Sequence, residues 1–272
     1  MQIFFDLQDL RYLNWSRTRH SSGTAGTLLK AQEEVKGKKI YYKLSSFDIR
    51  DGIVGHECVN ELIADRLLTA LDISHLDYEL VHALIQIDGK EYETYLCRSQ
   101  DYKQPGEIKT SLEAYHYAYG NEGESAFDFC IRMGWSKYLC EMFLVDYLIR
   151  NRDRHGANIE VLKAGDGSVR LAPLFDHGLS LLYDQKDPSQ RTKKDLLEDK
   201  KVMDYIGTGY TFENLSLLPK EQLIKLPGNK AKIITGLFDG IDDAILPKVY
   251  IEKISEMISG RWKLYEVFRN SK

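Results

Sequence analysis

Two short polar segments lie on either side of a predicted hairpin in the second half of the chain. The first reads N-R-D-R-H-G-A-N over residues 151–158, and the second reads D-H-G over residues 176–178. If Asp153 and Asn158 follow a helix and Asp176 ends the second strand, the three side chains converge at one end of the hairpin. Carboxylate and amide oxygens are the ligands that Mg²⁺ prefers, and substrate phosphates can complete its coordination. The spacing therefore predicts a site for a hard divalent cation, beside a carboxylate that can accept a proton.

Ordinary turns are the alternative explanation for these residues. Asp, Asn and Gly favour polar loops after helices, so a single D-R-H or D-H-G tripeptide is weak evidence. Here both segments occur in this order, separated by two short apolar pieces that read as a small hairpin, residues 159–162 and 169–174. The combination favours the cation site over two unrelated turns.

The two segments resemble the catalytic loop and the metal-binding aspartate of the kinase superfamily. The D-x-H-x-x-N order of residues 153–158 is similar to that of HipA-like serine/threonine kinases and of phosphoinositide kinases, and differs from the H-R-D order of eukaryotic protein kinases. The resemblance implies that Asp153 is the catalytic base and that His155 is a buried organiser of the loop. It also implies that Asn158 and Asp176 hold Mg²⁺ and that ATP is the phosphoryl donor.

A kinase also needs a lysine that reaches the nucleotide phosphates from a strand. Residues 39–45 alternate in character, and Lys43 lies on the face opposite Ile40, Tyr42 and Leu44. Lys43 is therefore the predicted phosphate-binding lysine.

A glutamate on the following helix must hold that lysine. Glu61 begins the segment E-L-I-A-D-R-L-L, which is similar to the E-x-x-A-x-x-L pattern of the corresponding kinase helix. Glu57 lies one turn earlier on the same face and is the competing candidate. The pattern favours Glu61.

A segment rich in small residues, H-S-S-G-T-A-G-T over residues 20–27, precedes the Lys43 strand. Backbone amides of such a loop can approach phosphate, although it is neither a G-x-G-x-x-G loop nor a Walker A motif. The predicted nucleotide contacts in it are Ser21, Ser22, Gly23, Thr24, Ala25 and Gly26. By resemblance to HipA-like kinases, Ser21, Ser22 and Thr24 are also candidates for autophosphorylation. We expect the adenine to lie against Leu96 and Leu174.

The hydrophobic period changes near residue 100, which predicts an α+β chain with a sheet-plus-helix part followed by a mainly helical part. The resemblance to kinases implies that these parts form a bilobal, protein-kinase-like fold. A small N-terminal lobe of sheet and helix would span residues 1–97, and a mainly helical lobe residues 98–272. In the first lobe, residues 57–71 have helical spacing. The dipeptide Asp88-Gly89 predicts a hairpin that joins a strand at 78–87 to one at 92–97.

The second lobe is expected to contain two long helices. Apolar residues recur at helical spacing over residues 127–149 and again over residues 250–268. Asp146 lies inside the first of these, in an apolar context, and is predicted to be a buried structural partner of an arginine.

Composition excludes several other classes of protein. With 37 basic and 41 acidic residues, the net charge of -4 provides no field for a polyanion, so we expect no direct nucleic-acid binding. The four cysteines form no C-x-x-C pair, which argues against a zinc knuckle or a disulfide framework and favours the reducing cytoplasm. Neither a signal peptide nor a membrane-spanning stretch is expected.

The predicted function is ATP- and Mg²⁺-dependent transfer of the γ-phosphoryl group to a protein serine or threonine, in the manner of a HipA toxin. The resemblance also implies an antitoxin partner. Full-length HipA toxins have a further subdomain before the phosphate loop, where this chain has about twenty residues, so the usual pairing with a DNA-binding antitoxin is not expected. The alternatives are a lipid or small-molecule kinase of the same fold, which the acidic balance disfavours for anionic membranes, and a nucleotide-binding pseudokinase scaffold.

Overall fold

The computed structural model describes residues 3–18, 25–185 and 187–272. The predicted phosphate-loop residues Ser21, Ser22, Gly23 and Thr24 lie outside them, whereas the backbone of Ala25 and Gly26 begins a strand.

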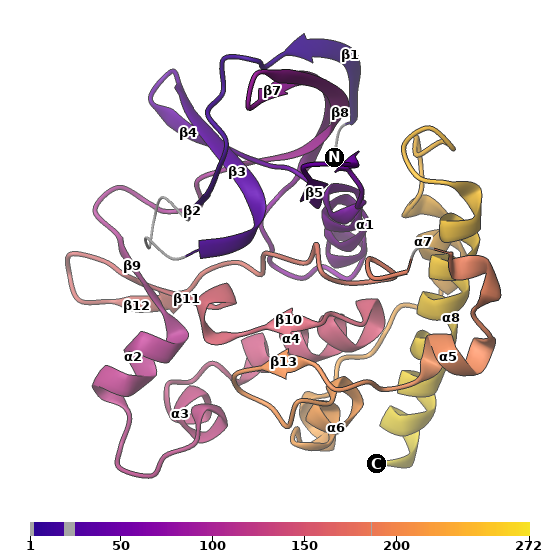
Figure 1. Ribbon diagram of the computed structural model, residues 1–272. Coiled ribbons are helices and arrows are strands. Elements are labelled where there is room, and N and C mark those ends of the chain that lie inside the picture. The colour runs from indigo at the N-terminus through magenta and orange to yellow at the C-terminus, as the bar shows by residue number, and fades with distance from the viewer. Residues whose placement is uncertain (1–2, 19–24, 186) are drawn as a thin grey trace.

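A six-stranded sheet forms the N-terminal part of the molecule, at the top of Figure 1. Its order is β1-β7-β8-β4-β3-β2, in which β1 runs parallel to β7 and the other neighbours are antiparallel. The strands are β1 (Ile3–Asp9), β2 (Ser16–Thr18), β3 (Ala25–Val35), β4 (Lys38–Lys43), β7 (Glu79–Ile87) and β8 (Lys90–Gln100). Two short strands, β5 (Phe47–Asp48) and β6 (Gly52–Ile53), pair with each other.

The predicted hairpin is confirmed as β7 and β8. Ile87 pairs with Lys90, so only Asp88 and Gly89 form the loop, and both have positive φ, 50° and 80°. This is the conformation of the two-residue turns that Asp-Gly favours. The division into lobes between residues 97 and 98 stays a prediction, and it falls inside β8, which continues to Gln100.

Helix α1 (Glu57–Ala70) also agrees with the prediction, and it lies between the sheet and the helical part of the molecule (Figure 1). Its buried residues include four charged or amide ones, Glu57, Asn60, Glu61 and Asp65, each at most 2% exposed. Burying a carboxylate is costly unless it is paired. These side chains therefore indicate where α1 meets polar partners.

The C-terminal part is mainly helical and surrounds one large hydrophobic core that also includes the inner face of α1. Its helices are α2 (Leu112–Tyr119), α3 (Ala126–Arg132), α4 (Ser136–Ile149), α5 (Lys193–Leu197), α6 (Thr211–Ser216), α7 (Lys230–Gly236) and α8 (Lys248–Ser271). The predicted C-terminal helix is confirmed as α8.

The single long helix predicted over residues 127–149 is wrong, because the chain breaks it into α3 and α4. Gly134 has φ +78°, its N–H donates to the carbonyl of Ile131, and the N–H of Trp135 donates to that of Cys130. This pair of bonds is a Schellman ending, which requires a left-handed residue that glycine supplies without strain.

Two further small sheets lie outside the six-stranded sheet. The predicted hairpin is confirmed as β11 (Glu160–Lys163) and β12 (Val169–Leu171), and β9 (Ile108–Ser111) adds a third strand to it. Strand β10 (Asp153–Arg154) pairs in parallel with β13 (Met203–Asp204). The D-x-H-x-x-N segment therefore begins on β10, directly before β11.

Candidate active site

Lys43 ends β4, and its ammonium group contacts two carboxylates. Nζ donates to Asp176 Oδ1 at 2.6 Å and to a carboxylate oxygen of Glu61 on α1. Lys43 is only 9% exposed, and Glu61 is fully buried. Glu57, the competing candidate, instead accepts hydrogen bonds from the backbone N–H and the hydroxyl of Ser46. The structure thus brings Lys43, Glu61 and Asp176 together from three separate segments.

The charge of Lys43 is retained despite its burial. Burial by itself lowers the pKa of a lysine, but the carboxylates of Asp176 and Glu61 outweigh it and hold the pKa of Lys43 well above 10.5. Glu61 also accepts a hydrogen bond from the backbone N–H of His177 at 2.8 Å. The site therefore presents a fixed positive charge beside a carboxylate, which suits an anionic phosphate together with a cation.

Helix α1 is docked directly on the D-H-G segment. Asn60 Nδ2 donates to the carbonyls of Gly178 and Ser180, both at 3.0 Å. A Cβ on Gly178 would lie 3.2 Å from the Cβ of Glu57 and 3.3 Å from Glu61 Oε1, so the close approach of the helix favours glycine here. This contact places Glu61 close enough to Asp176 for both carboxylates to contact the ammonium group of Lys43.

Asp176 itself has an unusual backbone conformation. Its φ of +62° lies in the left-handed region, and its N–H donates to the hydroxyl of Tyr78 at 3.3 Å. Left-handed non-glycine residues are uncommon and persist where the surrounding structure fixes them. The backbone thus directs the carboxylate toward Lys43.

Arg154 is buried and organises the D-x-H-x-x-N segment. It forms a two-bond ion pair with Asp146 of α4, Nε to Oδ2 at 2.9 Å and Nη2 to Oδ1 at 2.8 Å. Its Nη1 donates to the carbonyl of Asn158 at 3.2 Å and to that of Phe175 at 2.9 Å. Because Phe175 precedes Asp176, one guanidinium nitrogen holds the segments of both predicted metal ligands side by side.

This arrangement corrects the expectation for His155. Its side chain is 31% exposed, and its Nδ1 accepts a hydrogen bond from the N–H of Ala157, so it is not buried. The expectation that Asp146 pairs with an arginine is confirmed.

Asn158 and Asp153 contact each other directly. Asn158 Nδ2 donates to the backbone carbonyl of Asp153 at 2.9 Å and to its Oδ2 at 3.4 Å. The amide nitrogen therefore faces Asp153, and the amide oxygen faces away from it. The Asp153 side chain is 23% exposed, so an acceptor hydroxyl can reach it.

The oxygen donors of this site fit Mg²⁺. The amide of Asn158 and the carboxylate of Asp176 are hard ligands on adjacent segments, and two protein ligands plus phosphate oxygens and waters are a usual magnesium set.

A cavity opens between the sheet and the hairpin β11–β12, next to Lys43. It is lined by Lys30, Ala31, Tyr41, Tyr42, Lys43, Leu76, Tyr78, Cys97, Ser99, Tyr102, Lys109, Glu160, Phe175 and Asp176. The rings of Tyr102 and Phe175 stack at 5.9 Å with an interplanar angle of 26°. A cavity lined by both aromatic rings and lysine ammonium groups suits a planar base that carries phosphates.

Leu96 and Leu174 do not line this cavity in the described part of the chain, which corrects the expectation for the adenine contacts. Leu96 is fully buried in the core of the sheet, and Leu174 is buried in the large core. Successive residues of β8 face opposite sides of the sheet, so Cys97 lines the cavity instead of Leu96, and Phe175 lines it instead of Leu174. Cys97 pairs directly with Lys43 across β4 and β8.

Comparison with solved structures identifies this architecture. A proinflammatory kinase of Helicobacter pylori, CtkA, superposes with a TM-score of 0.64 at 14% identity, and the alignment covers 95% of this chain and 94% of that one. HipA of Shewanella oneidensis MR-1, from a complex with HipB and operator DNA, gives a TM-score of 0.50 at 15% identity. That alignment covers 91% of this chain but only 66% of the HipA chain. The chain has a kinase-like fold.

The bilobal α+β prediction is therefore confirmed. No protein-family model matches the sequence, and a search of curated proteins finds no match. At these identities the likeness establishes the kinase-like fold, and the roles of individual residues stay predictions. No helix among the described residues combines the length and apolarity needed to cross a bilayer.

The sequence interpretation missed several residues of this kinase-like site. Tyr41, Tyr102 and Phe175 supply aromatic surface to the cavity, and Tyr78 holds the N–H of Asp176. Arg154 could have been found, because it lies inside the D-R-H tripeptide, eight residues after the buried Asp146. The aromatic residues lie on separate elements and have no shared motif.

We expect Asp146→Asn to destabilise the protein by about 3–5 kcal/mol, because it leaves the buried Arg154 guanidinium without its counterion. Urea unfolding of the variant measures this loss. Asp166→Asn is the matched control, since Asp166 lies in the exposed turn of the β11–β12 hairpin and, among the described residues, its carboxylate accepts side-chain and backbone hydrogen bonds from Ser168. A loss for Asp146→Asn no larger than for Asp166→Asn would show that the pair does not hold the loop.

Proposed function

We propose that this protein is an ATP- and Mg²⁺-dependent kinase that phosphorylates serine or threonine hydroxyls of a protein. The observation that carries the proposal is the ammonium group of Lys43, held between Glu61 and Asp176 at the end of a cavity suited to a nucleotide. Phosphoryl transfer depends mainly on positioning and on charge stabilisation, and these groups supply both.

Each residue has a defined task in the proposed reaction. Lys43 binds the phosphates of ATP, and Glu61 fixes the direction of its side chain. Asn158 and Asp176 hold Mg²⁺, which when bound neutralises charge that develops as the γ-phosphoryl group leaves. Asp153 accepts a hydrogen bond from the acceptor hydroxyl, orients it toward the γ-phosphorus and takes up its proton.

The choice of a protein acceptor rests on the resemblance of the D-x-H-x-x-N segment to HipA-like kinases. The HipA neighbour was solved with HipB, so a protein partner of the antitoxin kind is part of the proposal. The net charge of -4 argues against an anionic membrane as the substrate surface. We propose that the reaction takes place in the cytoplasm.

Incubation of the purified chain with γ-labelled ATP tests this function. We expect Mg²⁺-dependent label on the chain itself or on an added protein, in acid-stable phosphoserine or phosphothreonine. Label on lipid or on a small molecule instead would move the acceptor to another class. Thermal stabilisation by ATP and Mg²⁺ without transfer to any acceptor would replace the kinase by a nucleotide-binding scaffold.

A further inference from the structure

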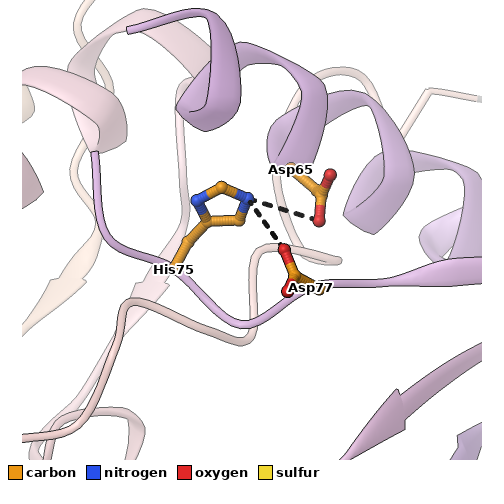
Figure 2. Close-up of side chains that lie close together, drawn as sticks. All are labelled: Asp65, His75 and Asp77. Carbon is orange, nitrogen blue, oxygen red and sulfur yellow. Dashed lines mark ion pairs between the residues drawn. The ribbon is translucent and has the colours of Figure 1, made fainter. Parts of the chain in front are cut away.

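Three side chains of metal-ligand type meet away from the candidate active site. Asp65 lies on α1, one helical turn after Glu61, and His75 and Asp77 lie on the segment that joins α1 to β7 (Figure 2). One ligand atom from each lies within 4.8 Å of the other two. We propose that Asp65, His75 and Asp77 bind a divalent cation of the zinc type.

The spacing of these groups fits ligands of one ion better than direct hydrogen bonds. His75 Nε2 lies 3.4 Å from Asp65 Oδ1 and 4.0 Å from Asp77 Oδ1. A charge-assisted N–H···O bond is about 2.7–2.9 Å long. Metal bonds of about 2.0–2.2 Å at tetrahedral angles separate their ligand atoms by roughly 3.4 Å. The first distance matches this separation, and the Asp77 side chain, which is 98% exposed, can rotate to match it.

The histidine is oriented as a metal ligand requires. His75 Nδ1 lies 2.7 Å from the carbonyl of Ile73, so Nδ1–H donates to that oxygen and Nε2 carries the lone pair. Ligating histidines usually donate their other ring N–H in this way. The hydroxyl of Thr69 lies 3.3 Å from Nε2 and is a further polar neighbour of this ring nitrogen.

The carboxylate of Asp65 supplies an independent observation. Asp65 is 1% exposed and points from α1 toward the His75 ring (Figure 2). Its Oδ1 accepts the N–H of Tyr78 at 2.9 Å, but its Oδ2 is buried and accepts no hydrogen bond from the described residues. The oxygen that the 3.4 Å distance joins to His75 is Oδ1, so the Asp65 carboxylate as a whole is a buried charge with one donor among the described residues. A cation bound to this carboxylate compensates the cost of its burial.

The ligand set selects the class of ion. One imidazole nitrogen with two carboxylates suits Zn²⁺ and its first-row neighbours, whereas Mg²⁺ prefers oxygen ligands alone. Three protein ligands leave a fourth position for water, on the exposed side of Asp77.

The position of the site means that a bound ion would join α1 to the segment that contains His75. The segment around His75 forms an isolated parallel β-bridge with Leu174, two residues before the D-H-G motif, because Leu76 N–H donates to the carbonyl of Leu174 and Leu174 N–H donates to that of Ser74. An ion at this site clamps α1 to this segment. It therefore stabilises the arrangement in which Glu61 meets Lys43.

Metal titration of the purified chain tests the site without any measurement of kinase activity, so its result is independent of the proposed function. Burial lowers the pKa of His75, but Asp65 and the Ile73 carbonyl raise it to a net increase, so the titration is done at about pH 8 to limit proton competition. We expect one equivalent of Zn²⁺ to raise the Tm by about 4 °C or more, whereas Mg²⁺ at the same concentration does not. Co²⁺ should give the visible absorption of a tetrahedral ion with nitrogen and oxygen ligands, without a thiolate band.

Two variants make the assignment specific. Asp77→Asn changes an exposed side chain and leaves folding intact, and we expect it to weaken Zn²⁺ binding at least about tenfold. His75→Gln should remove the Co²⁺ spectrum. His82→Gln is the control, since His82 is a β7 histidine paired with Glu93, and it should bind Zn²⁺ like the unmodified chain. Unchanged binding by both Asp77→Asn and His75→Gln, or no stoichiometric binding by the unmodified chain, would overturn the proposal.

Discussion

If the proposed function holds, we expect Asp153→Asn to lower the rate of phosphoryl transfer by about 10²–10⁴-fold and to leave ATP binding nearly unchanged. The amide keeps the shape of the side chain and an oxygen that can accept the hydrogen bond from Asn158 Nδ2. It cannot take up the proton of the acceptor hydroxyl, and general-base catalysis contributes a factor of this size. Single-turnover transfer and thermal stabilisation by ATP measure the two quantities separately.

The matched control is Asp166→Asn, which makes the same chemical change in an exposed hairpin turn. It should transfer phosphate at the rate of the unmodified chain. If Asp153→Asn also transfers at that rate, Asp153 is not the base. If Asp153→Asn loses ATP binding together with activity, its role is in holding the nucleotide site, and the assignment is equally wrong.

Local sequence signals predicted the parts of the fold that local physics controls. The Asp88-Gly89 turn has the two positive φ angles that this dipeptide favours, and α1 begins at the residue that helical spacing indicated. Gly134 is also a local indication that a helix ends, but apolar residues continue at helical spacing on both sides of it, and a single helix was predicted for this reason. A glycine that follows six or seven helical residues deserves a test as a helix ending.

The edge strand β1 was harder to predict. A strand is recognised by alternating apolar and polar residues, and this alternation arises only where one face of the strand is buried and the other is exposed. Strand β1 lies at the edge of the sheet, and Phe5 and Leu7 are exposed on it. Apolar residues on a solvent face erase the period of two that marks a half-buried strand. Its parallel pairing with β7 joins segments about 75 residues apart, for which the sequence carries no local signal.

The candidate site was predictable in its charged residues and not in its apolar ones. Lys43, Glu61 and Asp176 were found because their types and order follow the chemistry, and the structure places them in contact. The predicted adenine contact, Leu96, is adjacent to Cys97, which lines the cavity. Successive residues of a strand face opposite sides of the sheet, so an error of one residue selects the wrong face. Residue type indicates the chemistry of a side chain, but the register of β8 against β4 decides which of two neighbouring residues lines the cavity.

Lys43→Met should abolish measurable activity, with a loss of at least about 10²-fold, and should also destabilise the protein by about 3–5 kcal/mol. The first effect follows because a fixed positive charge at the transferring phosphate is lost. The second follows because Glu61 stays buried without its cation, facing the carboxylate of Asp176. The activity of Lys43→Met alone therefore does not distinguish the loss of a catalytic group from the loss of folded protein.

The double variant Lys43→Met with Glu61→Gln separates the two losses. Glutamine removes the uncompensated buried charge and can still accept the hydrogen bond from the N–H of His177, so urea unfolding should show stability recovered by 2 kcal/mol or more, roughly half the loss. Activity should stay absent, because no group replaces the ammonium at the phosphates. A stable, inactive double variant assigns Lys43 to catalysis independently of folding. A double variant that regains transfer would instead make Lys43 a structural counterion for Glu61 and remove it from the reaction.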